Sequence, residues 1–155
     1  MTKTIHSLLI AASFSMCLPA VAQTPLPLLQ QSHVQANSPE PAQFHALLKR
    51  DLNSYFAAKY KQKFTLQYEM LRHGPTQCGA AYPKYYVWIT LRFAQSSIGG
   101  AVRVAAIDKV KFQITDFVSA DQIRKRPTDI ETVFPALLCP AILQHARAII
   151  SPDET

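Results

Sequence analysis

The sequence predicts an α+β fold, in which an N-terminal helix packs on a four-stranded antiparallel meander and short C-terminal helices follow. Three features carry this prediction: one stretch with apolar residues at steps of three and four, then four stretches that alternate with a period of two, then a part punctuated by prolines. Short links between consecutive strands favour antiparallel pairing. The first helix should therefore cover one face of the sheet.

The first 22 residues have the three-part layout of a secretory signal peptide. Lys3 precedes an apolar run, and the small-residue triplet Ala20-Val21-Ala22 precedes the expected cleavage site. The run includes several polar residues and is shorter than the roughly 20 apolar residues that a membrane-spanning helix needs. We therefore expect an exported protein, periplasmic or secreted, whose mature chain has no transmembrane segment.

The mature chain is expected to have three parts. Residues 23–37 are rich in Gln and Pro and predict a flexible tether. Residues 38–150 form the predicted single domain, and the acidic tail 151–155 is expected to fray. The domain carries 15 basic and 8 acidic side chains, which leaves a net charge of +7 against +6 for the whole chain.

The first helix is expected over residues 38–60. Ser38-Pro39-Glu40 is typical of a helix start, with a capping side chain, a proline in the first turn and a carboxylate near the positive end of the dipole. An apolar stripe then follows at helical spacing: Phe44, Leu47, Leu48, Leu52, Tyr55 and Phe56.

Strands are expected at 64–70, 85–93, 101–107 and 110–118, with a turn at 96–100. In the last hairpin, a two-residue loop would place Val102 and Val104 on the face of Lys111. A three-residue loop through Val110 places them with Phe112 and Ile114 instead. Because a one-residue slip turns every side chain over, burial favours the three-residue loop.

Two capping-box patterns predict short helices after the sheet, at Ser119-Ala120-Asp121-Gln122 and at Thr128-Asp129-Ile130-Glu131. A last helix is expected to begin near Pro140, with an apolar stripe along one side.

A helix followed by an antiparallel meander resembles, in outline only, the cystatin-like and nuclear-transport-factor-like folds. Gln95-Ser96-Ser97-Ile98-Gly99 looks like the Gln-x-Val-x-Gly hairpin of cystatin protease inhibitors, but Ser97 replaces the central Val. The segment also follows the second strand after the helix, whereas the cystatin hairpin follows the first. Protease inhibition by this loop is therefore not the expectation.

Loss of the signal peptide removes Cys17 and leaves Cys78 and Cys139 in an oxidising compartment, which predicts one disulfide between them. A metal or redox role is poorly supported, because neither cysteine has a Cys-x-x-Cys partner.

No complete catalytic set is visible. The chain lacks a Gly-x-Ser-x-Gly elbow, a phosphate-binding glycine loop and metal-ligand spacing, so no cofactor or metal is expected. The weak catalytic candidates are His73, with Glu69 or Asp116 as partner, since these carboxylates could approach each other across the sheet. His45 and His145 are interpreted as solvated positions on helix flanks.

Two surfaces are candidates for binding. If the first helix covers one sheet face, the reverse face presents Tyr86, Trp88 and Arg92, joined by Lys111 and Phe117, as an aromatic and cationic surface. The alternative is that the C-terminal helices cover this face and make Trp88 part of a second core.

The second candidate is basic. Lys59, Lys61 and Lys63 follow one another at alternate positions, and Arg124-Lys125-Arg126 forms another run. An exported protein is not expected to meet nucleic acid, whereas proteins and anionic envelope polymers are accessible partners. The leading hypothesis is thus a non-catalytic exported binding or accessory module. A small hydrolase and a structural subunit of an envelope assembly are the alternatives.

Overall fold

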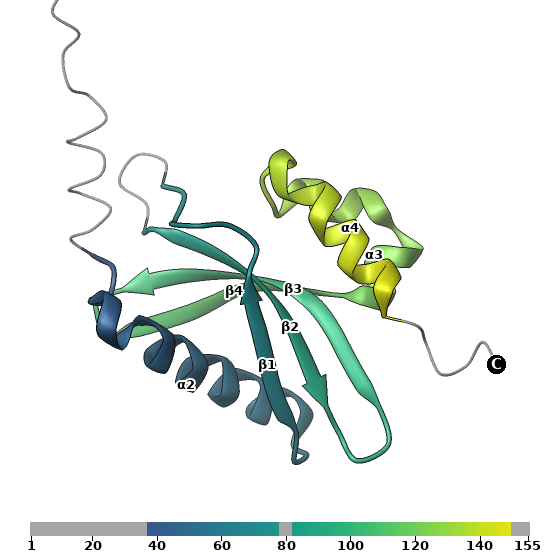
Figure 1. The fold of residues 1–155 in the computed structure, drawn as a ribbon, viewed down its shortest axis with the longest axis horizontal. Helices are drawn as coiled ribbons and strands as arrows, with labels where there is room; N and C mark the ends of the chain where they lie inside the picture. Colours follow the sequence, from purple (N-terminus) through teal and green to yellow (C-terminus); the bar gives the residue numbers. More distant parts are fainter. Residues whose placement is uncertain (1–36, 78–81, 150–155) are drawn as a thin grey trace, which may run out of the picture.

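The computed structural model describes residues 37–77 and 82–149 (Figure 1). The predicted signal peptide, most of the predicted tether, Cys78 and the C-terminal tail lie outside the described residues.

The α+β prediction is confirmed. Within the described residues, a long helix precedes a sheet with the order β1-β2-β3-β4, in which each strand pairs antiparallel with the next, and short helices follow. The elements are α2 (Pro41–Tyr60), β1 (Thr65–Met70), β2 (Lys84–Arg92), β3 (Ser97–Ile107), β4 (Lys111–Ser119), α3 (Ala120–Lys125), the 3-10 turns η1 (Pro127–Thr132) and η2 (Ala136–Leu138), and α4 (Cys139–Ala148).

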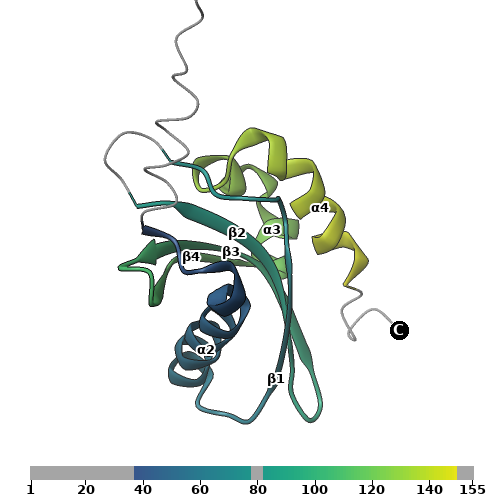
Figure 2. The same ribbon diagram turned by 60° about the vertical axis from the view of Figure 1, so that its left-hand side comes forward.

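The sheet lies between two helical layers, with α2 on one face and α3 and α4 on the other (Figures 1 and 2). The first core joins the fully buried Leu48, Leu52 and Phe56 of α2 to the apolar side chains of one sheet face. The second core joins the other face to the C-terminal helices. Both sheet faces are therefore used for packing.

The first helix begins later than the sequence predicts. Glu40 precedes Pro41 and has an extended ψ of 141°, so the helix starts at Pro41 without a side-chain cap. A residue before proline is driven out of the helical region by the proline ring, and this applies to both Ser38 and Glu40. Ser38 instead hydrogen-bonds through Oγ to the Tyr85 hydroxyl at 2.7 Å.

The last hairpin has the expected three-residue loop, since Ile107 pairs with Lys111 and Val104 pairs with Ile114. The register then shifts between Arg103 and Val104, which makes Thr115 an extra residue in β4. This bulge turns the following residues over, so Phe117 faces α2 in the first core rather than the reverse face. The expectation for Phe117 was wrong because the bulge leaves no clear mark in the sequence.

The capping box at Ser119 is confirmed, with Ser119 and Gln122 bonded to each other's backbone amides. The second pattern does not form. Pro127 takes the first position of η1, and Arg126 precedes it, so Thr128 lies inside the turn rather than at its cap.

The expected turn at 96–100 is also shorter, because β3 already begins at Ser97. Ile98, Gly99 and Gly100 therefore belong to the strand. A Cβ on Gly99 would meet the Ile149 side chain, and one on Gly100 would lie 2.7 Å from the Val118 carbonyl oxygen. These glycines are thus used for close packing of the two cores.

Candidate functional site

The reverse face of the sheet is closed by the C-terminal helices (Figure 2). Tyr86 is 4% exposed and Trp88 is 5% exposed. They share the second core with buried apolar residues of the sheet and the C-terminal elements: Ala101, Ala120, Ile123, Ile130, Phe134, Leu138, Ile142 and Ala146. The open aromatic surface expected at Tyr86 and Trp88 is therefore not formed, and the covered alternative is the one observed.

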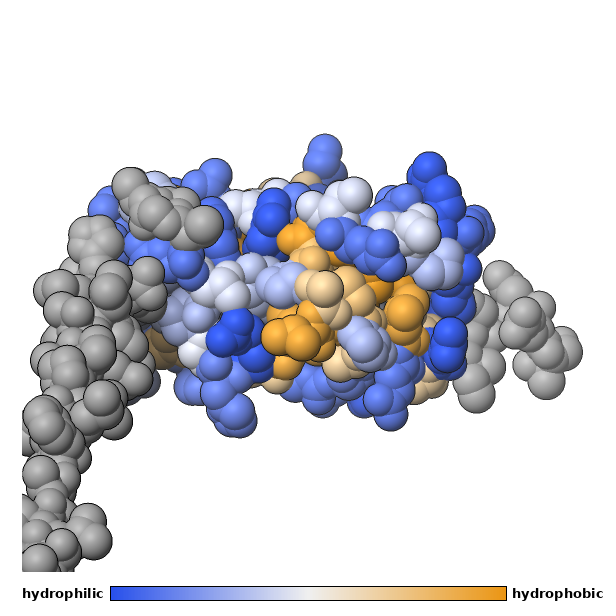
Figure 3. Space-filling view, turned by 90° about the horizontal axis from the view of Figure 1, so that it is seen from above, coloured by the Kyte–Doolittle hydropathy of each residue, from blue (hydrophilic) through white to orange (hydrophobic). Residues whose placement is uncertain are grey.

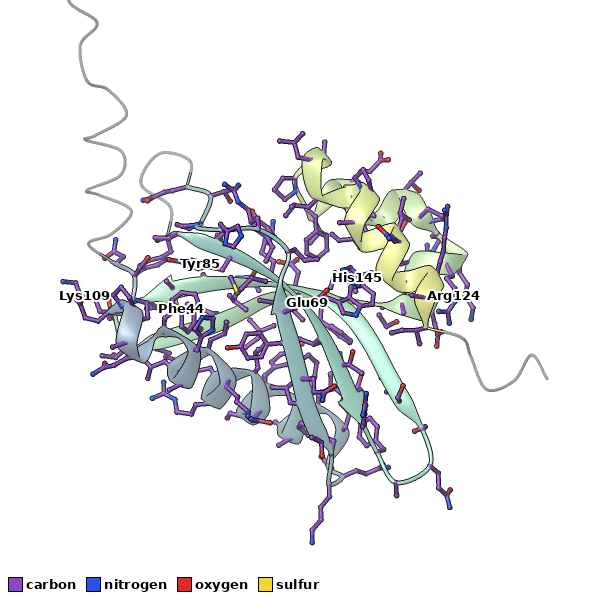
Figure 4. All side chains as sticks on the ribbon, viewed as in Figure 1. Phe44, Glu69, Tyr85, Lys109, Arg124 and His145 are labelled. Carbon is purple, nitrogen blue, oxygen red and sulfur yellow. The ribbon has the colours of Figure 1, made fainter. Side chains whose placement is uncertain are left out.

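One side of Trp88 borders a groove of about 310 Å³ between β1 and α4. His145 of α4 stacks on the Trp88 ring, with centroids 5.1 Å apart, and its Nε2 lies 2.7 Å from Oε1 of Glu69. Figure 4 shows Glu69 and His145 side by side between the strand and the helix. His145 is thus a packed residue that holds α4 against β1, not the solvated flank position that the sequence suggested.

The weak catalytic set is not brought together. Glu69 and Asp116 lie on β1 and β4, the two opposite edges of the sheet, which three strand spacings separate by about 14 Å. Each already has a partner, His145 for Glu69 and Arg103 for Asp116, the latter at 2.6 Å. His73 lines a different cavity, which neither carboxylate lines. The expected approach of the two carboxylates was wrong because the meander puts the first and last strands farthest apart.

Four cations gather where α2 ends, β1 begins and β2 ends, and we call this surface the basic end. It consists of Lys59, Lys61, Lys63 and Arg92, and all four are exposed. Arg92 pairs with Thr65 in the sheet, which lies two residues after Lys63. None of the four forms an ion pair within the described residues. Segments 54–68 and 89–102 contain no Asp or Glu, so no carboxylate of these segments neutralises the basic end.

Aromatic rings lie beneath the basic end. The Lys59 ammonium lies 5.1 Å from the centroid of the Phe117 ring and 5.9 Å from that of Tyr55. A cation over a ring keeps its charge while the side-chain stem is held in place. Lys59 also lies in the last turn of α2, where a cation favours the helix dipole. A structural role for Lys59 is therefore present beside any role in binding.

The other predicted cations are separated from the basic end or used within the fold. Arg124 donates to the Ala146 and Ile149 carbonyl oxygens, at 2.8 and 3.0 Å, and so holds the last turn of α4. Lys111 is exposed at the hairpin end of β4, the far end of the sheet from Arg92. The expected grouping of Lys111 with Arg92 was wrong. Arg92 lies beside the first residue of β3 and Lys111 beside the last, so the whole length of β3 separates them.

The predicted disulfide stays a prediction, because Cys78 lies outside the described residues. Cys139 is 8% exposed at the start of α4, and its Sγ lies 3.6 Å from the Pro135 carbonyl oxygen. Burial, and secondly the charge of Glu131, raise the pKa of the Cys139 thiol. A thiol with a raised pKa is a poor nucleophile at neutral pH, so a catalytic role for Cys139 has no support.

A second cavity, of about 670 Å³, lies at the opposite end of α2, and we call it the helix-start cavity. Its titratable lining residues are Glu40, His45, Arg72, His73 and Tyr85. Sequence reasoning found only His73. Arg72 and His45 were missed because their meeting depends on the packing of α2 beside β1, although the pair Arg72-His73 at a strand end was a visible signal.

Within residues 37–77 and 82–149, no three His, Cys, Asp or Glu side chains are grouped as metal ligands. Among the same residues, none of the helices has the length and apolar character needed to cross a membrane. Comparisons with protein families, with curated proteins and with solved structures gave no match.

Proposed function

We propose that this protein is a non-catalytic exported binding module that recognises an anionic envelope component through the basic end. The observation that supports the proposal most directly is a cluster of four exposed cations at one end of the fold that form no ion pair with any residue the structure describes: Lys59, Lys61, Lys63 and Arg92. Export itself rests on the signal-peptide pattern of the first 22 residues.

The affinity of such a surface depends on how many charges act together. A single exposed ion pair contributes little, because water and salt screen it. A partner with repeated phosphate, sulfate or carboxylate groups contacts several cations at once, and each cation near an anionic membrane surface adds about 1 kcal/mol. Such binding should weaken steeply as salt is added. Exposed lysines and an arginine suit a partner of variable geometry better than one small ligand.

The experiment compares two variants that lose the same number of charges. In the basic-end variant, Lys59, Lys61, Lys63 and Arg92 are all changed to Gln. In the control variant, the exposed cations Lys49, Lys109, Lys125 and Arg147 are changed to Gln instead.

Binding to membranes is measured by co-sedimentation with phosphatidylglycerol vesicles. Binding to a soluble polyanion is measured separately, by titration with dextran sulfate. We expect the basic-end variant to lose about tenfold or more in affinity and the control variant to lose much less. Phosphatidylcholine vesicles should bind neither. Equal losses in both variants would show that net charge alone attracts the protein, and the proposal would fail.

A protein partner is the second candidate, and one observation favours it. Leu137 in η2 is 93% exposed, the largest exposure of a large apolar side chain in the described residues. Figure 3 shows hydrophobic surface gathered over the C-terminal helices. A stoichiometric partner that co-purifies with the protein, but not with the Leu137→Gln variant, would support an accessory-subunit role. If the partner co-purifies equally with the Leu137→Gln variant, the Leu137 surface is not where it binds.

A further inference from the structure

The helix-start cavity combines an apolar wall with a cationic rim. Phe44, Met70 and Tyr85 line it, together with three prolines, and the Phe44 and Tyr85 rings meet edge to face with centroids 4.8 Å apart. Figure 4 shows Phe44 on α2 and Tyr85 on the sheet above it, near the start of the helix. The volume of about 670 Å³ lies within the range of roughly 300 to 1,000 Å³ that small-molecule sites occupy.

Arg72 gives the rim its charge. Four of the arginines, Arg50, Arg103, Arg124 and Arg126, each pair with a carboxylate. Arg72 is half-buried, yet it makes no hydrogen bond or ion pair with any described residue. A partly desolvated guanidinium without an acceptor is a favourable partner for a carboxylate, which it can bind through two parallel hydrogen bonds.

The other polar groups of the cavity fit the same ligand. His73 is exposed next to Arg72 in the chain and can donate a second hydrogen bond to an anionic group. His45 Nδ1 is bonded to the Tyr68 hydroxyl at 2.9 Å, which leaves its Nε2 for other contacts. Glu40 is the one carboxylate among the lining residues, and it is exposed and forms no salt bridge with Arg72.

We infer that the helix-start cavity binds a small organic carboxylate, with the anionic group on Arg72 and His73 and an apolar part against Phe44, Met70 and Tyr85. This site is separate from the basic end, because the 20 residues of α2 lie between them and span about 30 Å. It selects a single compact anion with an apolar body, whereas the basic end would select a polymer.

The test uses the full chain with 4-phenylbutyrate as the probe and 4-phenylbutan-1-ol as its neutral counterpart, followed by NMR titration. We expect the carboxylate to shift the signals of Phe44, Met70 and His73, and the alcohol to bind about tenfold more weakly or worse, as for the loss of hydrogen bonds to a charged group. Arg72→Gln should weaken carboxylate binding by a similar factor. Arg147→Gln removes an exposed arginine of α4 and should leave binding unchanged.

Four results would overturn the inference, and three of them concern binding of the probe. One is equal affinity for the acid and the alcohol, a second is equal affinity of the Arg72 and Arg147 variants for the acid, and a third is no shift at millimolar acid. Contacts in the free protein from leucines of segment 23–36 to Phe44 or Tyr85 would likewise show that the chain itself fills the cavity. If Arg72→Gln does not fold, Arg72→Lys replaces it. Lysine keeps the charge but loses the two parallel bonds, so intermediate weakening supports the inference and unchanged binding contradicts it.

Discussion

Lys61 ends α2 in a left-handed conformation, with a φ of 53°, and its amide bonds to the Ala57 carbonyl oxygen. Glycine is the usual residue at such a helix end, because other side chains are strained there by about 1 to 2 kcal/mol. This strained position holds an exposed lysine between Lys59 and Lys63 in the chain. We interpret Lys61 as a position where charge on the basic end is kept at the expense of local stability.

Replacement of Lys61 should therefore separate stability from binding. Lys61→Gly is expected to raise the free energy of unfolding by about 0.5 to 1 kcal/mol, since strain is relieved and glycine's entropy offsets part of the gain. The same variant should bind phosphatidylglycerol vesicles more weakly. Chemical denaturation and co-sedimentation measure the two effects. Lys61→Gln is the control, which removes the charge and keeps the strain. A Lys61→Gly variant that is less stable would contradict the interpretation.

We expect Tyr85 to make the free energy of unfolding sensitive to alkaline pH. Burial raises the pKa of the Tyr85 hydroxyl above its ordinary value near 10, while the hydrogen bond between Tyr85 and Ser38 opposes the shift. Because the folded-state pKa is the higher one, the stabilisation is complete below about pH 10 and is lost as the pH rises through the folded-state pKa. Urea denaturation from pH 8 upward should show this loss above about pH 10, and Tyr85→Phe should reduce it. An identical pH profile in both proteins would contradict the assignment.

At the scale of elements, α2 is fastened to the edge strand β4 by two polar side chains. The Phe112 amide donates to the Asp51 carboxylate at 2.7 Å, and Arg50 donates to the Val110 carbonyl oxygen at 2.8 Å. Arg50 and Asp51 also form an ion pair. The Asp51 bond satisfies an amide on the outer edge of β4, which no other strand of the described residues covers, and the Arg50 bond satisfies a carbonyl of the hairpin loop before β4.

Asp51→Ala should lower the free energy of unfolding by about 1 to 3 kcal/mol, because the Phe112 amide loses its acceptor in a largely buried place. The effect should also appear as faster hydrogen exchange of the Phe112 amide. Glu131→Ala, at an exposed carboxylate, is the control and should change stability by less than about 0.5 kcal/mol. Equal free energies of unfolding in the two variants would show that the bond from the Phe112 amide to Asp51 does not stabilise the fold.

Local signals account for the elements that the sequence predicted correctly. The capping box at Ser119 and the burial argument for Val104 and Ile114 depend on neighbours in the chain or across one hairpin. The start of α2 was placed too early because two prolines alternate there, and each favours an extended residue before it. The bulge at Thr115 escaped prediction because no local sequence signal marks it, and the contact of Phe117 with Phe56 of α2 that accompanies it is tertiary.

On the scale of the whole molecule, the second core buries Trp88 and Tyr86, the aromatic residues that the sequence offered as a binding surface. The alternation in β2 predicted correctly that Trp88 and Tyr85 face opposite sides of the sheet. Whether the Trp88 side was open could not be read from alternation, because an amphipathic strand is compatible with water or with a helix layer on its polar face. The basic residues at 59–63 were visible in the sequence, but their meeting with Arg92 depends on the register of β1 with β2.

Binding at the basic end should leave the closed face of the sheet undisturbed. The most direct measurement is the map of backbone and indole NMR shifts on addition of dextran sulfate at low salt. We expect shifts confined to residues 57–66 and 91–97, with the Trp88 indole signal unchanged. Shifts at Trp88 and Tyr86, with residues 57–66 unaffected, would show instead that the helical layer opens over the sheet and that the basic end is not the binding surface.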